Sequence, residues 1–328
     1  MNKIKIIAEA GVNHNGKIKN AIKLVNIAKL AGANYVKFQI YKTENLLLKN
    51  TSTAEYQKKN TKFNNQFQML KKYELSYDEH LQIYQYCKKI KIKYLASVFD
   101  EESLLFLKSF QNIVKIGSGE ITNLSLLSKI SDLRMEVILS TGASNFYDVC
   151  TAVNNLKRNK LIILHCHSSY PSETFRNLNL NCITKYKKKF KVEVGFSDHT
   201  KNFYASIIAL GLGSTIFEKH LTINKKLTGP DHMSSLDPKE FNKYVSILNL
   251  CNEALGDGVK KITLEEEKNI LLIRKSLYAK QPIKKGERFS KSNLIPLRPN
   301  KGISANKFFQ ILGKKSKKTY KKFDLIER

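Results

Sequence analysis

Short apolar runs rich in β-branched residues alternate with helical stretches along most of this chain. This alternation is typical of βα units, and it predicts a parallel sheet whose strands are connected by helices. Eight runs qualify as strands: Ile4–Ala10, Tyr35–Tyr41, Tyr94–Phe99, Ile113–Gly117, Glu136–Ser140, Leu161–Cys166, Val192–Phe196 and Thr215–Leu221. The expected helices include Asn20–Ala31, Tyr77–Lys89, Glu101–Phe110, Tyr204–Gly211 and, after the last strand, Pro238–Ala254. Eight strands are the number that a closed (β/α)8 TIM barrel requires.

The main alternative to a barrel is a doubly wound sheet, which binds dinucleotides at a glycine-rich first turn. The first strand–helix turn of this chain, residues 11–16, reads GVNHNG. It does not match the GxGxxG pattern of such a turn. The barrel is therefore the favoured fold.

The composition of the chain changes after residue 258. We expect residues 1–258 to form the barrel, 259–274 a linker with some helix, and 275–328 a small, mostly β domain. A domain of that size is too small to be very stable unless it docks on another surface. Within the barrel, the polar segment 42–75 is expected to form an extended loop over the mouth, where long loops usually serve function.

The charge of the chain is strongly positive, with a formal net value of +29. Residues 271–328 contain seventeen Lys or Arg against three Asp or Glu. A nucleic-acid-binding surface would combine such a cluster with interleaved aromatic residues, and these are not interleaved here. We interpret the cluster as a solvated face that also attracts small anionic substrates, and we expect no nucleic-acid partner.

The sequence also bears on localisation. It contains no run of eighteen uncharged apolar residues, so we expect no membrane-spanning segment. The first apolar run reaches Glu9 too early for a signal peptide. The five cysteines are scattered and form no CxxC pair, which is typical of thiols in a reducing cytoplasm. We therefore expect a cytoplasmic protein.

Polar residues lie at the C-terminal ends of seven of the eight predicted strands, where barrels carry their catalytic groups. They include Glu9, the pair Lys37 and Gln39, and the groups after strand four, Lys115, Ser118 and Glu120. The later strands end in Ser140-Thr141, His165 to Ser168, Ser197 to His199, and Glu218 to His220. One such residue is usually a satisfied core group, but seven polar ends indicate an active site, because each unpaired buried charge is costly.

Two pairs of histidines could bind a divalent metal at the C-terminal ends of the strands. His199 and His220 come from the ends of neighbouring strands, whereas His165 and His167 have i, i+2 spacing on one strand. Two imidazoles completed by water or carboxylate oxygens would suit Mn²⁺, Zn²⁺ or Co²⁺. Spacing alone leaves both pairs open. Lys219 is expected to face the helices and to be structural.

Three serines and two lysines at strand ends indicate an anion site. They are Ser118, Ser140, Ser197, Lys37 and Lys115. Each serine alone could be a helix N-cap. Together, short donors in glycine-containing turns beside two ammonium groups favour binding of a phosphate at the barrel mouth.

These motifs have a recognisable order along the chain. The runs IAEAGVNHNG, VKFQ, KIGSGE, ILSTG, LHC, SSYPS, GFSDHT, EKH, GPDH and a late RP-x-KGIS resemble the sialic acid synthase family over nearly the whole chain. The resemblance implies a TIM barrel followed by an antifreeze-like (SAF) domain. It also implies an enzyme, a transferase that condenses phosphoenolpyruvate with an N-acetylmannosamine-type sugar and water to give a nonulosonic acid and phosphate. The alternatives within the family are legionaminate and pseudaminate synthases, which use a 6-deoxy-2,4-diacetamido hexose.

The resemblance also assigns residues. It prefers His199 and His220 for the metal, with Mn²⁺ favoured and Mg²⁺ or Co²⁺ as alternatives. The catalytic carboxyl groups would be Glu9, Glu120 and Glu218. The substrate-binding residues would be Lys37, Gln39, Lys115, Ser118, Ser140, Ser168, Tyr170, Ser197, Asp231 and Arg298.

Arg298 lies in the predicted small domain, and the resemblance implies that it completes the site in the barrel of a second chain. A domain-swapped homodimer is therefore expected. The main rival reaction is that of a Schiff-base aldolase with Lys115 or Lys37 as the nucleophile. One departure from the family pattern is the sequence RPNKG in place of the commoner RPGKG.

Overall fold

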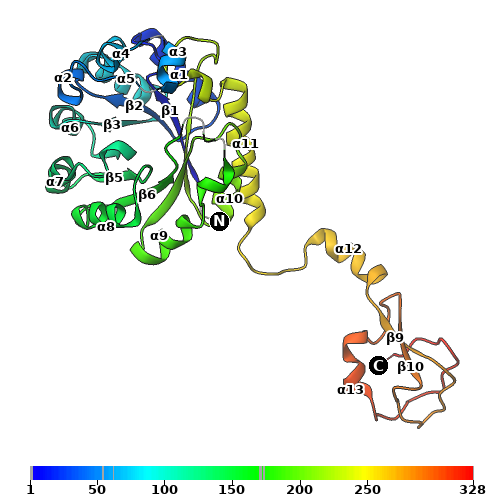
Figure 1. Cartoon of the computed structure of the whole chain (residues 1–328). Helices are drawn as coiled ribbons and strands as arrows, with labels where there is room; N and C mark the ends of the chain where they lie inside the picture. Colours follow the sequence, from blue (N-terminus) through cyan, green and yellow to red (C-terminus); the bar gives the residue numbers. More distant parts are fainter. Residues whose placement is uncertain (1–2, 54, 62, 170–171, 173, 328) are drawn as a thin grey trace. The chain divides into compact units, whose positions relative to one another are not determined.

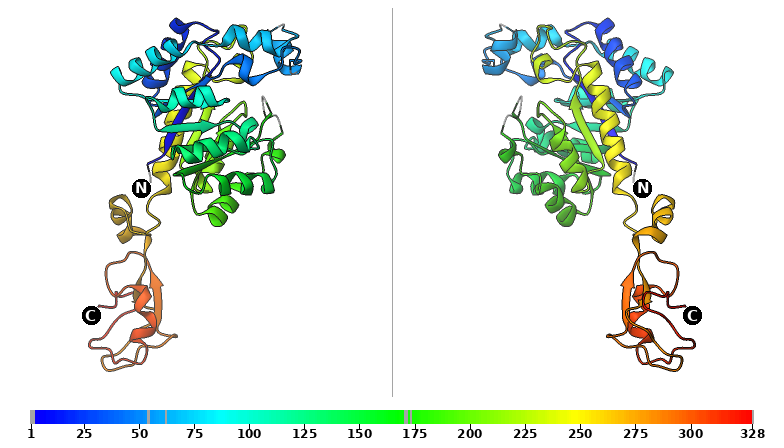
Figure 2. Two further views of the ribbon diagram at one scale, coloured as in Figure 1. Left: turned by 90° about the vertical axis from the view of Figure 1, so that its left-hand side faces the viewer. Right: turned by 90° about the vertical axis from the view of Figure 1, so that its right-hand side faces the viewer.

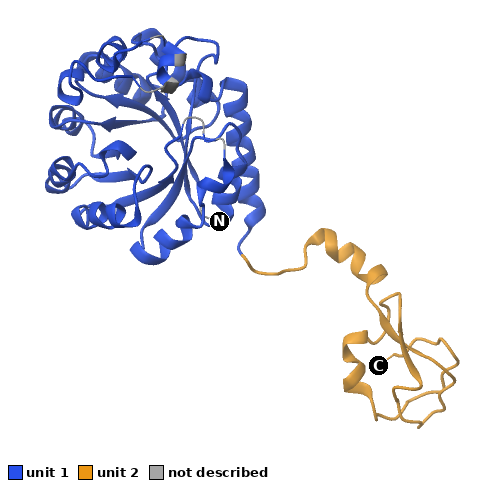
Figure 3. Cartoon of the chain, in the orientation of Figure 1, with its two compact units in different colours: residues 1–257 blue, residues 258–328 orange. Residues whose placement is uncertain are grey.

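The computed structural model describes residues 3–53, 55–61, 63–169, 172 and 174–327. The chain divides into two compact units, Met1–Asp257 and Gly258–Arg328 (Figure 3). Each unit has its own hydrophobic core, and each is described by itself.

The first unit is a closed barrel of eight parallel strands in sequence order, with β1 paired to both β2 and β8 (Figure 1). The strands are β1 (Lys5–Gly11), β2 (Tyr35–Ile40), β3 (Lys93–Val98), β4 (Ile113–Ile116), β5 (Glu136–Ser140), β6 (Leu161–Cys166), β7 (Glu193–Asp198) and β8 (Ile216–His220). The predicted TIM barrel is confirmed, and no predicted strand end is displaced by more than two residues.

Helices surround the strands on the outside of the barrel, as the two side views show (Figure 2). They are α1 (Ile18–Leu30), α5 (Tyr77–Lys89), α6 (Glu101–Lys108), α7 (Leu124–Asp132), α8 (Phe146–Asn155), α9 (Cys182–Phe190), α10 (Tyr204–Gly211) and α11 (Pro238–Leu255). Local sequence explains where several begin. Ser76 and Glu79 form a capping box at α5, and Asp237 does the same for α11 with proline at the first turn.

Alternation along each strand separates two apolar layers. In β2, Val36, Phe38 and Ile40 face the helices and belong to the main core. A second cluster of residues from other strand positions fills the barrel interior: Ile7, Tyr35, Leu95, Ile138, Ile162, Leu164 and Ile216. Because these side chains lie in the N-terminal and middle parts of the strands, the interior near the C-terminal ends is left to polar groups.

The segment 42–75 differs from the expectation of an extended loop. It contains three helices, α2 (Thr43–Leu46), α3 (Glu55–Thr61) and α4 (Gln66–Tyr73), which lie together at one end of the barrel (Figure 1). Met69 and Tyr73 of α4 are buried against Val12 and Tyr41 in a small cluster of their own. This contact supplies apolar burial that the polar sequence does not reveal. The prediction of a loop was therefore wrong for the helical parts of the segment.

The second unit contains helix α12 (Leu264–Ile273), strands β9 (Ser276–Ala279) and β10 (Leu294–Leu297), and the short helix α13 (Phe308–Ile311). β9 and β10 pair antiparallel. Leu277, Leu294 and Ile326 are buried in its core. Across the described residues of both units, no helix is long and apolar enough to cross a membrane.

Candidate active site

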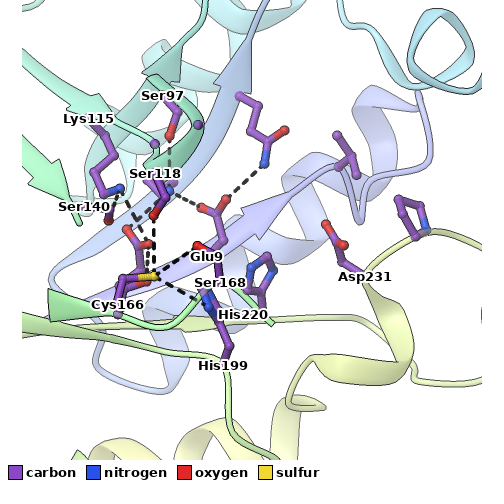
Figure 4. Close-up of a pocket in the computed structure, with 18 of the residues that line it drawn as sticks. Glu9, Ser97, Lys115, Ser118, Ser140, Cys166, Ser168, His199, His220 and Asp231 are labelled. Atoms are coloured by element: carbon purple, nitrogen blue, oxygen red, sulfur yellow. Dashed lines mark hydrogen bonds and ion pairs between the residues drawn. The ribbon is translucent and has the colours of Figure 1, made fainter. Parts of the chain in front are cut away.

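A cavity of about 360 Å³ opens at the C-terminal ends of the barrel strands (Figure 4). Twelve of the fifteen residues predicted to form the site line it: Glu9, Lys37, Gln39, Lys115, Ser118, Ser140, Ser168, Ser197, His199, Glu218, His220 and Asp231. The chain therefore brings together side chains that lie more than two hundred residues apart, because the C-terminal ends of parallel strands meet at one face of a barrel.

Lys37 of β2 lies at the centre of the charged groups. Its Nζ is 3.2 Å from Glu9 Oε2 and 3.2 Å from Glu218 Oε2, and it donates a hydrogen bond of 3.1 Å to Ser97 Oγ. Burial disfavours the ammonium, but the Glu218 and Glu9 carboxylates outweigh it and raise the Lys37 pKa. Burial also raises the Glu9 pKa to about 7, against the opposing effect of Lys37.

Lys115 of β4 is the second buried cation. Its Nζ donates to Ser140 Oγ at 2.6 Å and lies 3.9 Å from Glu218 Oε1. Burial lowers the Lys115 pKa to about 8, although the Glu218 carboxylate acts in the other direction. Burial would raise the Glu218 pKa, but Lys115, Lys37 and the 2.9 Å hydrogen bond from Ser197 Oγ bring it down to about 2. Glu218 is therefore a permanent carboxylate, and Glu9 is close to its titration point at neutral pH.

The serines lie beside a backbone that approaches them closely. The Gly142 N–H donates to Ser118 Oγ at 3.0 Å, and a Cβ on Gly142 would lie 2.0 Å from Ser168 Oγ and 2.7 Å from Ser118 Oγ. A side chain at this position would have to displace both serine hydroxyls. Hydroxyls from three strand ends and two ammonium groups together form a donor-rich pocket suited to phosphate and carboxylate oxygens.

His199 and His220 face each other in the same cavity, with ring centroids 5.6 Å apart. His199 Nδ1 is 2.9 Å from the His167 carbonyl oxygen. In the neutral ring this makes Nδ1 the donor and leaves the lone pair on Nε2, an arrangement common to metal-binding histidines. Burial, reinforced by the charges of His199 and Lys37, holds the His220 pKa well below its usual value, so this ring stays neutral.

The donor set has a clear limit. Among the described residues, no group of three or more His, Cys, Asp or Glu side chains is arranged to enclose a metal ion. The two imidazoles therefore fit a borderline divalent cation that takes its remaining ligands from water or substrate oxygens. Of the rival pair, His165 bonds the Leu178 carbonyl at 2.7 Å, and both it and His167 line a neighbouring cavity instead.

Three predicted residues are not among those lining the cavity. Glu120 lies in a short 3-10 helix, where it accepts a hydrogen bond of 2.7 Å from Asn123 Nδ2, and its role in the site stays a prediction. Tyr170 lies outside the described residues. Arg298 is exposed on the second unit, beside β10.

The sequence reasoning also missed residues of the cavity. Ser97 of β3 and Cys166 of β6 line it, together with Phe99 and, from the segment 42–75, Gln57 and Leu70. Alternation would have found Ser97, since it shares a strand face with the interior residue Leu95. No periodicity could have found Gln57, because α3 was not expected.

The whole chain is similar to known proteins. Residues 24–260 match the model of the NeuB family, and residues 274–322 match that of the SAF domain. An N,N'-diacetyllegionaminic acid synthase from Campylobacter jejuni is 44% identical over 333 residues, which cover 99% of each chain. A pseudaminic acid synthase from the same organism is 34% identical over 334 residues, or 99% of this chain and 96% of the relative.

The crystal structure of an N-acetylneuraminic acid synthetase from Leptospira borgpetersenii, in complex with citrate, superposes with a TM-score of 0.72. It is 33% identical and covers 82% of this chain and 90% of its own. Fold, motif order and similarity to curated synthases over the full length agree. The chain is an enzyme that belongs to the NeuB family, and it carries a SAF domain after its barrel.

Proposed function

We propose that this enzyme condenses phosphoenolpyruvate with a 6-deoxy-2,4-diacetamido hexose and water, giving an N,N'-diacetyllegionaminate-type nonulosonic acid and phosphate. The observation that carries the proposal is the cavity itself, in which two buried lysines and three strand-end serines lie beside two imidazoles. The choice of sugar is supported by the identity of 44% to an N,N'-diacetyllegionaminic acid synthase.

In this proposal, Lys37, Lys115, Ser118, Ser140 and Ser197 bind the phosphate and carboxylate of phosphoenolpyruvate. The two ammonium groups already face Glu9 and Glu218, so they are fixed in place before the substrate arrives. Positioning of this kind lowers the barrier because little reorganisation is needed during the reaction. An anionic substrate also favours the protonated form of Lys115, whose pKa of about 8 is close to neutrality.

His199 and His220 would hold a divalent cation, Mn²⁺ being favoured, and such a cation polarises the carbonyl oxygen of the open-chain sugar. C3 of the enol phosphate would form a bond to the aldehyde carbon, and the aldehyde oxygen would become a hydroxyl with a proton supplied by the water that adds at C2. Water adds at C2 and loses a proton, and cleavage of the C2–O bond releases phosphate. Glu9, with a pKa of about 7, is the group we assign to accept the proton of that water.

Two further roles belong to the sugar side. We assign Gln39 and Asp231, which line the same cavity, to sugar hydroxyl and acetamido groups, and we assign Ser168, which lies beside Cys166 and Ser118, to the substrate oxygens at that side. Arg298 of a second chain would contact an acetamido group in a domain-swapped homodimer. A specific alternative is N-acetylmannosamine as the acceptor, which the likeness to the N-acetylneuraminic acid synthetase favours.

Phosphate release from phosphoenolpyruvate tests the proposal. The purified chain is assayed with Mn²⁺ and one of three acceptors: the manno-configured 6-deoxy-2,4-diacetamido hexose, its altro isomer, or N-acetylmannosamine. We expect the first to give the highest kcat/KM, by at least about tenfold, because a site built for an acetamido group leaves polar groups unpaired with a hydroxyl.

EDTA should abolish this activity, and Mn²⁺ should restore it. A preference for N-acetylmannosamine would instead identify the enzyme as an N-acetylneuraminate synthase. Activity that survives EDTA, together with a lysine adduct trapped by borohydride, would replace the metal mechanism with Schiff-base chemistry.

A further inference from the structure

The residues that precede the two histidines form a buried ion pair on the other side of the barrel wall. Asp198 ends β7 and Lys219 lies in β8, and the two are direct neighbours in the β7–β8 register. Lys219 Nζ is 3.1 Å from Asp198 Oδ1, and the two side chains are only 1% and 0% exposed. They face the helices, whereas His199 and His220 face the cavity, because successive residues of a strand alternate between its faces.

Both side chains of the ion pair make further hydrogen bonds to their surroundings. Lys219 Nζ also donates to the Thr200 carbonyl and, at 2.9 Å, to the Asn202 carbonyl. Asp198 Oδ1 accepts from Thr200 N at 2.8 Å and from Thr200 Oγ1 at 2.7 Å, and Oδ2 accepts from Ser206 Oγ at 2.7 Å. Ser206 of α10 is in turn 3.0 Å from the Tyr244 hydroxyl of α11.

These contacts hold the backbone directly after His199 in place. Asp198 fixes the N–H of Thr200, and Lys219 fixes its carbonyl, so the chain immediately after His199 is attached to the strand that carries His220. The location of one imidazole therefore depends on the location of the other. Neither Asp198 nor Lys219 lines the catalytic cavity, so direct contact with substrate does not explain them.

Stability alone does not explain the pair either. Removing two charges from water is costly, and apolar residues of similar size usually stabilise a fold at least as well as a buried ion pair. A geometric requirement is the remaining reason to bury one at this place. We propose that Asp198 and Lys219 are positioning residues that set the separation of His199 and His220 and thereby the affinity of the site for its divalent cation. This inference rests on the proposed metal site.

Mn²⁺ binding to the purified full-length protein, followed by electron paramagnetic resonance, tests the inference without turnover. The double variant Asp198→Asn/Lys219→Met removes both charges and keeps the approximate volume, so it leaves no unpaired buried charge. We expect it to fold, as circular dichroism and thermal unfolding would report, and to bind Mn²⁺ at least about tenfold more weakly, as other outer-sphere substitutions do. Phosphoenolpyruvate affinity in the metal-free protein should change less than twofold.

The chain offers a matched control at the opposite end of β7. Lys5 and Glu193 form an ion pair of 3.3 Å with about a third of each side chain exposed. The variant Lys5→Met/Glu193→Gln also removes one positive and one negative charge, but far from the histidines. It should bind Mn²⁺ like the wild type.

The possible outcomes distinguish a wrong metal site from a wrong positioning role. If the wild type does not bind Mn²⁺, or His220→Ala binds it equally well, the metal site is wrong and this inference falls with it. If the wild type binds through His220 and the folded double variant has the same Mn²⁺ affinity, only the positioning role is refuted. Should the double variant fail to fold, the isosteric Asp198→Asn decides: a several-fold loss of Mn²⁺ affinity supports the role, and unchanged affinity overturns it.

Discussion

At the scale of single residues, the cavity is organised by four buried charges whose pKa values are pushed apart. Glu218 is held at about 2 and Glu9 is raised to about 7, although both face Lys37. The difference arises because Lys115 lies near Glu218, while burial dominates at Glu9. Two carboxyl groups of one site thus receive different chemical roles from their surroundings.

The lowered pKa of Lys115 leads to a prediction about pH. The protonated ammonium attracts phosphoenolpyruvate and the neutral amine does not, so affinity should be full below pH 8 and fall as the pH rises through it. The loss should approach about tenfold per pH unit well above the pKa. Isothermal titration of phosphoenolpyruvate between pH 6.5 and 9.5 measures it. Lys115→Arg keeps its charge and should bind more weakly but with a flat profile; an equally steep profile would assign the titration to another group.

At the scale of elements, the loop between β5 and α8 presents its backbone to the serines. A methyl group on Gly142 would enter the space of Ser168 and Ser118. Gly119, on the rim of the same cavity, has no atom within 4 Å of the place where its Cβ would lie. The two glycines therefore form a natural comparison.

Gly142→Ala should displace the Ser118 and Ser168 side chains and weaken phosphoenolpyruvate binding by about tenfold or more, since overpacking of this kind typically costs 1–3 kcal/mol. Gly119→Ala should leave both binding and thermal unfolding close to the wild-type values. Titration calorimetry and thermal denaturation of the two variants check this. Equal affinities would mean that the serines tolerate the shift and do not need the close backbone.

Some elements could be predicted from the sequence, and others could not. In β2 and β8, strict alternation separated the cavity residues Lys37 and Glu218 from the core, and the structure confirms their common location. Glu120 shares its 3-10 helix with Ser118, which lines the cavity, but its side chain bonds Asn123, and strand alternation does not predict side-chain direction beyond the end of β4. The helices of 42–75 were missed because Met69 and Tyr73 pack against Val12 and Tyr41, contacts that no local pattern reveals.

At the scale of the whole molecule, the proposed homodimer makes the second unit part of catalysis. Arg298 is exposed on that unit, and the unit buries no residue of α12. A module that serves the barrel of another chain makes the active site dependent on assembly. This dependence can be measured.

Mixing two inactive variants tests it. Arg298→Ala removes the arginine, and His220→Ala removes a proposed metal ligand. In a heterodimer, one of the two swapped sites contains neither substitution. Random exchange in an equimolar mixture should therefore restore about a quarter of wild-type activity. Activity after co-refolding, compared with each variant alone, is the measurement. The absence of any recovery in verified heterodimers would mean that each site is completed within one chain.

The shared pairing of Lys37 and Lys115 with Glu9 and Glu218 has a consequence for how such a site can change over time. Removal of Lys37 leaves Glu9 buried without a counterion, and removal of Glu218 does the same to Lys115. A stepwise change that begins at Lys37 or Glu218 therefore passes through a damaged intermediate. The mouth of the barrel can diversify freely around these four positions, in the helices of 42–75 and in the loops that face the sugar, while the anionic substrate stays fixed. New acceptors for the same donor are the changes that this architecture permits.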